Sequence, residues 1–258
     1  MNEQPRIRGV LLDLSGVLYA GNIPLPGAVP ALRKLKSSGL PVRYVTNTTR
    51  QPRTRILRAL NDMGFAIQSD EVFTPVQAAL DHLHKHAQRP HLLIHPDLRA
   101  EFAGLDLQSP NAVVLGDAAQ AFDYASLNAA FRLLMDGAQL LALGDNRYFR
   151  DADGLSLDIG PFKAALEYAA DTRACVLGKP AADFFLEAVS ALGCAPGEAI
   201  MVGDDAVADV EGALGAGLQG VLVRTGKYRD GDEDRIARPG ARTVDDLAAA
   251  VELILSAA

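Results

Sequence analysis

Short apolar runs alternate with segments of helical periodicity along most of the chain. The first part contains, in order, IRGVLLD, AVPALRKLKSSG, LPVRYVTN and TRILRALNDMGF. Runs of strand length alternating with helical segments are typical of βαβ units in a parallel sheet. Gly39 and Gly64 end the two helical segments, where a left-handed residue commonly stops a helix. The pattern predicts an α/β fold with a doubly wound, Rossmann-like parallel sheet.

The alternation returns toward the C-terminus after a middle region with a pattern of its own. The later segments are ACVLGK, ADFFLEAVSALG, AIMVGDD, VADVEGALGAG, LQGVLVRTG and VDDLAAAVELILSAA. The middle holds HLLIH, NAVVLGD, YASLNAAFRLLMDG, AQLLALGDNRYF, a hairpin at RDADGLS and the helix PFKAALEYAA. We predict a core domain made of residues 1–74 and 178–258, with residues 75–177 inserted as a separate α/β cap domain.

Composition narrows the class of protein and of partner. The 258 residues are 49% hydrophobic and 22% charged, as in ordinary globular proteins. No run reaches the roughly 18 apolar residues of a membrane span, and MNEQPRIRG lacks a signal-peptide core. We therefore expect a cytoplasmic protein without a membrane partner. The net charge of −7 argues against nucleic acid as a partner, since binding a polyanion needs a basic face.

Residues whose side chains could catalyse a reaction or bind a ligand follow the apolar runs in four places. They are Asp13, the pair Thr46 and Asn47, Lys179, and the group Asp204, Asp205 and Asp209. Because parallel strands present their carboxyl ends at one edge of the sheet, we expect these positions to converge there. Each position alone has a structural explanation, since an Asp or Thr after a strand often caps a helix or forms a turn.

The combined residue types suit phosphoryl transfer. A carboxylate that attacks a phosphate dianion meets a repulsion of about 4 kcal/mol per charge pair at 4 Å and an effective dielectric constant of 20. Asp13 and Asp204 offer oxygen ligands for Mg²⁺, and Lys179 offers a second cation. Thr46 and Asn47 would donate hydrogen bonds to phosphoryl oxygens. In this interpretation Asp13 is the nucleophile and forms an aspartyl-phosphate.

The same positions resemble the haloacid dehalogenase superfamily, in the subfamily with a type II A cap. The four motifs of that family correspond to Asp13-Leu14-Ser15-Gly16, Thr46-Asn47, Lys179 in Gly-Lys-Pro, and Gly203-Asp204-Asp205 with Asp209. The likeness continues through the middle region in LLIH, SPNAVVLGDA, LNAAF, NRYF and GLSLDIGPFKAALEYA, and after it in VRTGKYR.

The resemblance implies a role for each motif residue. It implies that Mg²⁺ is held by the carboxylates of Asp13 and Asp204 and by the backbone carbonyl of Ser15. Asp209 would orient the groups around the ion, with a lesser role of the same kind for Asp205. The substrate phosphate would be bound by Leu14, Ser15, Thr46, Asn47 and Lys179. The resemblance also implies a homodimer formed through the cap.

Ser15 departs from the pattern of most of the superfamily, in which an aspartate two residues after the nucleophile acts as acid and base. A serine hydroxyl is a poor acid near neutral pH, and losing a general acid costs about 10²–10⁴ in rate. A phosphoramidate, such as phosphohistidine or phospholysine, has a nitrogen leaving group that can depart already protonated. Pyrophosphate leaves as a stabilised phosphate. Ser15 therefore favours P–N and P–O–P substrates, either small phosphorylated molecules or phosphorylated protein side chains.

Two other functions remain open on the sequence. One is a small-molecule phosphomonoesterase of the same fold, and the other is a phosphate-binding or regulatory protein with weak turnover. GAGLQG at 215–220 matches G-x-G-x-x-G but runs from a helix into a strand, the reverse of a dinucleotide loop. His82 and His86 share a helical face that offers two imidazoles for a metal, but we interpret the pair as part of a solvated helix face. Cys175 and Cys194 have no metal-binding spacing.

Overall fold

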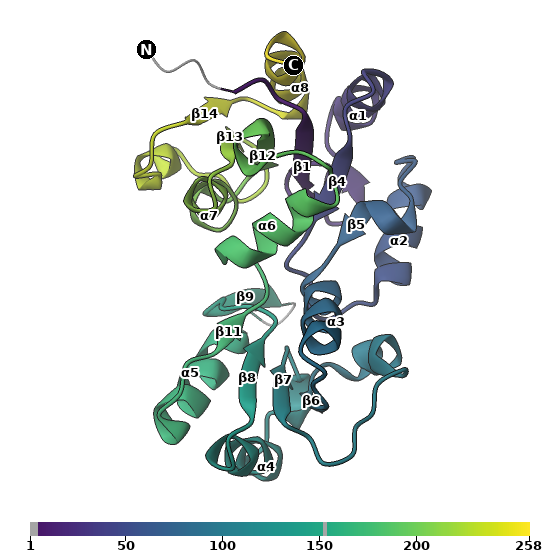
Figure 1. Cartoon of the computed structure of the whole chain (residues 1–258). Coiled ribbons are helices and arrows are strands. Elements are labelled where there is room, and N and C mark those ends of the chain that lie inside the picture. The colour runs from purple at the N-terminus through teal and green to yellow at the C-terminus, as the bar shows by residue number, and fades with distance from the viewer. Residues whose placement is uncertain (1–4, 152–153) are drawn as a thin grey trace. The chain divides into compact units, whose positions relative to one another are not determined.

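The computed structural model describes residues 5–151 and 154–258, and the chain forms two compact units (Figure 1). The core unit contains the described residues up to Thr46, Arg53–Phe73 and Lys179–Ala258. The second unit contains Asn47–Pro52 and Thr74–Gly178. None of the helices in the described ranges combines the length and the apolar character needed to cross a membrane.

The core unit is built on a six-stranded sheet in which every neighbouring pair is parallel. Its strand order is β14 (Ala241–Val244), β13 (Gln219–Val223), β12 (Ala199–Gly203), β1 (Gly9–Asp13), β4 (Val42–Val45) and β5 (Val72–Phe73). Every residue of β1, β12 and β13 is buried. Continuous burial is expected of central parallel strands that are covered on both faces, and it explains their nearly uninterrupted apolar sequences.

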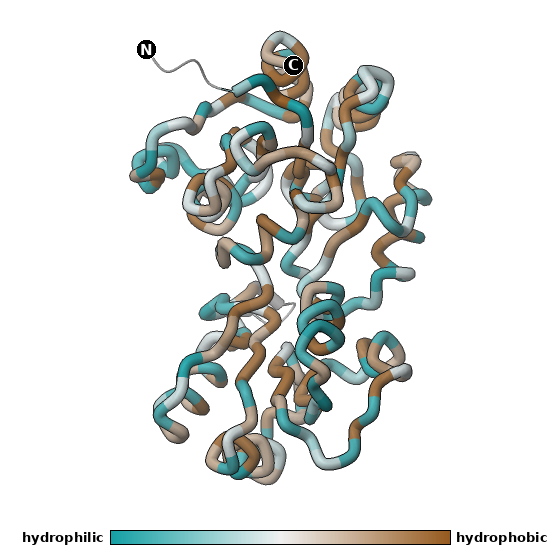
Figure 2. The backbone as a smooth tube through the Cα atoms, viewed as in Figure 1, coloured by the Kyte–Doolittle hydropathy of each residue, from teal (hydrophilic) through white to brown (hydrophobic). Residues whose placement is uncertain are grey.

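Helices of the core unit place one apolar face against this sheet. They are α1 (Ala28–Ser37), α2 (Arg53–Asp62), α6 (Ala182–Ser190), α7 (Gly212–Gly215) and α8 (Leu247–Ser256). Figure 2 shows mainly brown and pale segments along α8, which contacts α1, and both helices pack on the main apolar core. Gly39 and Gly64 follow α1 and α2 with φ of 81° and 88°, so both predicted helix stops are confirmed.

Short elements complete the core unit. A two-stranded hairpin, β2 (Tyr19–Ala20) with β3 (Ile23–Pro24), follows the turn after β1. Single 3₁₀ turns span Ser69–Glu71, Pro196–Glu198 and Asp232–Arg235. The segment predicted as a helix at 207–217 begins as a π-helix over Ala206–Glu211 and continues into the four residues of α7.

The second unit has its own parallel four-stranded sheet. The strand order is β11 (Cys175–Val176), β8 (Gln139–Ala142), β7 (Ala112–Leu115) and β6 (Pro90–Leu93). Its helices are α3 (Pro75–Lys85), α4 (Tyr124–Met135) and α5 (Ile159–Ala170), with 3₁₀ turns at Pro96–Phe102 and Ala119–Ala121. An antiparallel pair, β9 (Tyr148–Asp151) and β10 (Gly154–Leu157), forms the predicted hairpin, and its turn residues 152 and 153 lie outside the described residues.

Two features differ from the sequence-based expectation. The run ACVLGK contains β11, which lies inside the predicted cap range 75–177 and pairs with β8, so the strand before Lys179 is not a core strand. Lys179 is therefore the first residue of the chain's return to the core unit and does not end a core strand. The segment Asn47–Pro52 groups with the second unit because Arg50 is ion-paired with the buried Asp117 and lies 4.2 Å from the Phe149 ring centroid.

Candidate active site

Two aspartates meet at the carboxyl ends of neighbouring strands. Asp13 is the last residue of β1, and Asp204 directly follows β12, which pairs in parallel with β1. Parallel pairing brings the ends of both strands to the same edge of the sheet. The two residues are only 6% and 2% exposed, so their carboxylates are almost completely shielded from water.

Asp209 joins them from the π-helix that follows β12. Asp205 begins this helix, and its Oδ1 accepts hydrogen bonds from the backbone N–H groups of Val207 and Ala208 at 3.1 and 2.9 Å. The backbone N–H of Asp205 donates to Asp209 Oδ2 at 3.1 Å, which turns the Asp209 side chain back toward the strand end. A Cβ at Gly203 would lie 2.2 Å from the Asp209 Cβ, so this close approach requires glycine.

Lys179 contacts two of the acidic groups, although it lies far from Asp13 along the sequence. Its Nζ donates to Asp13 Oδ1 and, at 2.6 Å, to Asp209 Oδ1. The lysine is 4% exposed, so it is held inside the site as a fixed ammonium group. The predicted convergence of the first, third and fourth positions is therefore present within the core unit.

Burial and crowding of like charges dominate the electrostatics. Burial raises the pKa of Asp13 to about 7; Lys179 opposes this rise, and the neighbouring carboxylates add to it. Burial raises the pKa of Asp204 to about 6, and the charge of Asp209 contributes to the increase. Burial alone would lower the pKa of Lys179, but its two carboxylate partners outweigh burial and raise it.

The predicted phosphate-binding residues of the core unit lie at or after the same strand ends. Thr46 follows β4, the neighbour of β1, is 4% exposed, and its N–H donates to the Phe73 carbonyl at 3.3 Å. Leu14 is buried, and its carbonyl accepts a hydrogen bond from the Leu18 N–H at 2.9 Å. Ser15 is exposed. Asn47 belongs to the second unit, so the core unit by itself does not include it.

A loop after β13 also contributes to the site, although its residues entered the sequence-based prediction only within the run VRTGKYR and without a role. The backbone N–H of Lys227 donates to Asp204 Oδ2 at 2.6 Å. Gly226 and Gly16 have φ of 62° and 87°, and a Cβ on either would lie about 2 Å from Asp204 Oδ2, at 2.1 and 1.9 Å. The signal was available, because Thr225-Gly226-Lys227 follows an apolar strand just as Asp13 and Asp204 do.

The donor set fits a hard divalent cation. Carboxylate oxygens of Asp13, Asp204 and Asp209 all lie within 4.8 Å of one another. The ammonium of Lys179 contacts two of these buried carboxylates, those of Asp13 and Asp209, which leaves the negative charge of the three incompletely balanced. Oxygen ligands and an excess of negative charge are what Mg²⁺ requires.

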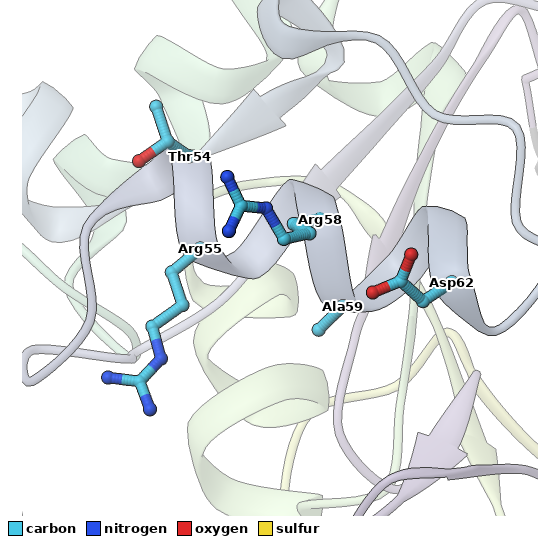
Figure 3. A pocket seen from close by; sticks show the side chains of 5 residues that line it. All are labelled: Thr54, Arg55, Arg58, Ala59 and Asp62. Atoms are coloured by element: carbon cyan, nitrogen blue, oxygen red, sulfur yellow. The ribbon is translucent and has the colours of Figure 1, made fainter.

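A separate pocket lies on the outside of α2. It is lined by Thr54, Arg55, Arg58, Ala59 and Asp62 (Figure 3). Figure 3 shows the guanidinium groups of Arg55 and Arg58 spread apart along the helix. None of the predicted site residues lines this pocket, so its position gives no support to the site chemistry.

The histidines of the second unit form no comparable cluster. The rings of His82 and His86 lie 4.4 Å apart between centroids, and His82 Nε2 is 3.4 Å from Gln139 Oε1. Among residues 5–151 and 154–258, the group of three or more candidate metal ligands contains aspartates and no histidine. His82 is half-buried and His86 is exposed, and the interpretation of the pair as part of a solvated helix face stays a prediction.

Comparison with known proteins agrees with the geometry. Residues 10–108 match the family described as haloacid dehalogenase-like hydrolase, and residues 176–250 match a second one described as HAD-hydrolase-like. The chain is 46% identical over 255 residues to haloacid dehalogenase-like hydrolase domain-containing protein 2 of Mus musculus, covering 99% of this chain and 98% of that protein. It is 47% identical over 257 residues to phospholysine phosphohistidine inorganic pyrophosphate phosphatase of Danio rerio, covering 97% and 95%.

A solved structure extends the likeness to the fold. The 4-nitrophenylphosphatase of Thermotoga maritima superposes with a TM-score of 0.86 at 26% identity, covering 96% of this chain and 97% of that one. The predicted parallel α/β fold is thereby confirmed. The identities of 46% and 47% to the two relatives extend over nearly the whole length. Together with the two family matches, they show that the chain is an enzyme of the haloacid dehalogenase-like hydrolase family.

Proposed function

We propose that the protein is a Mg²⁺-dependent phosphohydrolase that acts through a phosphorylated Asp13. The observation that carries this proposal is the buried cluster of Asp13, Asp204 and Asp209, two of which, Asp13 and Asp209, are ion-paired with Lys179. Clustered carboxylates suit a divalent cation, and a carboxylate beside such a cation can attack a phosphate whose negative charge the cation screens. The phosphatase names of a curated relative and of a similar solved structure support the same chemistry.

Each residue has a role that follows from its contacts. An Asp13 carboxylate oxygen attacks phosphorus, the bond to the leaving group breaks, and water later hydrolyses the acyl phosphate. Lys179 holds Asp13 in place and adds a fixed positive charge, and Asp209 holds Lys179. Mg²⁺, held by the carboxylates of Asp13 and Asp204 and the carbonyl of Ser15, would screen the negative charge of the incoming phosphate.

Phosphate release tests this proposal directly. Inorganic pyrophosphate, imidodiphosphate and 4-nitrophenyl phosphate are offered with Mg²⁺ and with EDTA, and orthophosphate is measured. We expect turnover with Mg²⁺ and its loss with EDTA. Borohydride added during turnover should convert Asp13 to homoserine, which peptide mass spectrometry detects. Absence of turnover on all three substrates would favour a phosphate-binding protein instead.

Ser15 supports a preference for P–N and P–O–P bonds. Its side chain is exposed, but a hydroxyl cannot protonate a leaving alkoxide efficiently near neutral pH. Substrates whose leaving group needs no proton in the transition state escape this limitation. Phosphohistidine, phospholysine and inorganic pyrophosphate belong to that class.

A series of aryl and alkyl phosphates with graded leaving-group pKa measures this preference. In the wild-type protein, log kcat/KM should fall steeply as the leaving-group pKa rises, because no acid assists departure. In Ser15→Asp the slope should become shallower, with a gain of about 10² for the least acidic leaving groups. A wild-type rate nearly independent of leaving-group pKa would contradict the proposal for Ser15.

A small-molecule phosphomonoesterase is the second candidate. The likeness to a 4-nitrophenylphosphatase structure favours it, since that name describes hydrolysis of a phosphate monoester. The two candidates differ in the ratio of rates on P–N and P–O–P substrates to rates on monoesters. A ratio below one with unactivated alkyl phosphates would decide for the monoesterase.

A further inference from the structure

The loop that follows β13 brings a second lysine to the rim of the carboxylate cluster. Lys227 uses its backbone N–H to hold Asp204 Oδ2 at 2.6 Å. Its side chain is 73% exposed, and Nζ lies 3.9 Å from Asp205 Oδ2. One residue therefore has its backbone bound to the site and its ammonium group in solvent.

Contacts between two loops fix the position of the Lys227 backbone. A Cβ on Gly226 would lie 2.4 Å from the Cα of Gly16, so the two backbones touch. The Thr225 hydroxyl donates to the Gly16 carbonyl. Because Gly16 adjoins Ser15, the Lys227 stem leaves the loop beside the turn that follows the proposed nucleophile.

The positively charged side chains near the site differ in their ion-pair partners and in their exposure. Lys179 is buried between Asp13 and Asp209, so its charge serves the nucleophile. Arg224, in the same loop as Lys227, pairs with Asp245 at 3.0 Å and with Glu233 at 3.8 Å. The contact of Lys227 with Asp205 is long and exposed, and such pairs contribute little stability. Exchanging that contact for a substrate anion costs little.

We propose that Lys227 is a specificity-determining residue that binds the phosphate that is not transferred in a diphosphate substrate such as inorganic pyrophosphate. This inference rests on the proposed function and narrows its substrate class. A monophosphate has its charge on the group that is attacked, where Lys179 lies. A diphosphate carries a second anionic group, and an exposed ammonium on a flexible stem at the rim matches that group.

The reaction balances without a general acid. The Asp13 carboxylate attacks one phosphorus of HP₂O₇³⁻, a bond from carboxylate oxygen to phosphorus forms, and the bridging P–O bond breaks. The electron pair stays on the bridging oxygen, giving an acyl phosphate with two negative charges and HPO₄²⁻. Four negative charges stand on each side. No proton has to be supplied to the leaving group, which agrees with Ser15, and Lys227 stabilises the departing phosphate.

Substitution of Lys227 with methionine tests the assignment while keeping the backbone N–H to Asp204. In Lys227→Met, we expect kcat/KM for pyrophosphate, relative to that for 4-nitrophenyl phosphate, to fall about 10–100-fold, the loss of a charge-assisted hydrogen bond. Lys227→Arg should recover most of the ratio because the charge remains. Arg229→Met, which removes a nearby exposed charge, should leave both rates unchanged.

Binding provides a readout that does not need turnover. In an Asp13→Asn background with Mg²⁺, calorimetry measures imidodiphosphate and orthophosphate. Adding Lys227→Met should weaken imidodiphosphate about 10-fold or more and orthophosphate much less.

The outcomes separate this inference from the proposed function. Equal losses for both substrates and both ligands would show that Lys227 acts only through Asp204 and would overturn the inference, as would no loss at all. A wild-type protein without turnover would contradict the proposed function, and the binding measurements would still decide the role of Lys227.

Discussion

Buried aspartates occur in both units, and their surroundings differ. In the second unit, Asp117 is 3% exposed, and each of its oxygens has a donor: the Ala119 N–H at 2.9 Å and the Arg50 guanidinium. In the core unit, Asp13, Asp204 and Asp209 crowd together, and the buried Lys179 is ion-paired with only two of them, Asp13 and Asp209. Asp117 is matched with one cation, Arg50, whereas the aspartate cluster of the core unit keeps an excess of negative charge.

This difference distinguishes structural from chemical use of a buried carboxylate. A matched ion pair fixes a segment, here Asn47–Pro52, and gains nothing from a further ligand. An unmatched cluster weakens the fold until a cation arrives, and it presents oxygens that can ligate or attack. Perturbed carboxylates of this kind are a recognised mark of functional sites.

The largest expected effect is on activity. Asp13→Asn removes the nucleophile, and we expect kcat on pyrophosphate to fall by at least about 10³-fold. Asp62→Asn, in the pocket on α2, is a matched control and should keep wild-type kcat. Circular dichroism would show that both variants are folded. Full activity in Asp13→Asn would contradict the mechanism.

The next effect is the dependence of stability on pH without metal. The folded-state pKa values of Asp13 and Asp204, about 7 and about 6, exceed the unfolded value of 3.8. Between about pH 4 and 7 the folded state therefore holds more protons, and the free energy of unfolding falls as pH rises, by a few kcal/mol. Denaturant titrations with EDTA should show this decline. Mg²⁺ should reduce it, since a bound cation favours ionised carboxylates.

Asp204→Asn isolates one member of the cluster. The variant should be more stable than wild type in EDTA at pH 8, by about 1–3 kcal/mol, because it removes a buried charge but keeps an acceptor for the Lys227 N–H. With Mg²⁺ the order should reverse. Asp205→Asn, which still caps the π-helix, is the control and should change little in either condition. Lower stability of Asp204→Asn in EDTA would mean that the cluster is not strained.

The smallest effect is expected in the second unit. Asp117→Asn should lower the free energy of unfolding by about 1–2 kcal/mol, less than a fully buried pair would lose, because Arg50 is 39% exposed. The double variant Arg50→Met, Asp117→Asn should recover part of that loss. Hydrogen exchange of residues 47–52 would report the change. An effect of Mg²⁺ on this loss would contradict the assignment of Asp117 as structural.

Local pattern was enough to predict most strands and the motif positions at their ends. Asp13 and Asp204 stand at the ends of apolar runs, and a doubly wound parallel sheet presents the carboxyl ends of its strands at one edge, so their meeting there was predictable. The grouping of Asn47–Pro52 with the second unit was not predictable, because it depends on the ion pair of Arg50 with the distant Asp117.

Other features of the site also depend on contacts that no local pattern reveals. The π-helix that aims Asp209 resembles an ordinary helix in periodicity. The role of Lys227 depends on the approach of its loop to Gly16, which only the tertiary structure shows.

The contact between Gly16 and Gly226 has a consequence for biosynthesis. Translation makes the proposed nucleophile well before it makes the loop that fixes Asp204. A nascent chain therefore carries Asp13 without a formed centre around it until the loop at Gly226 has been made. The centre cannot form before that point.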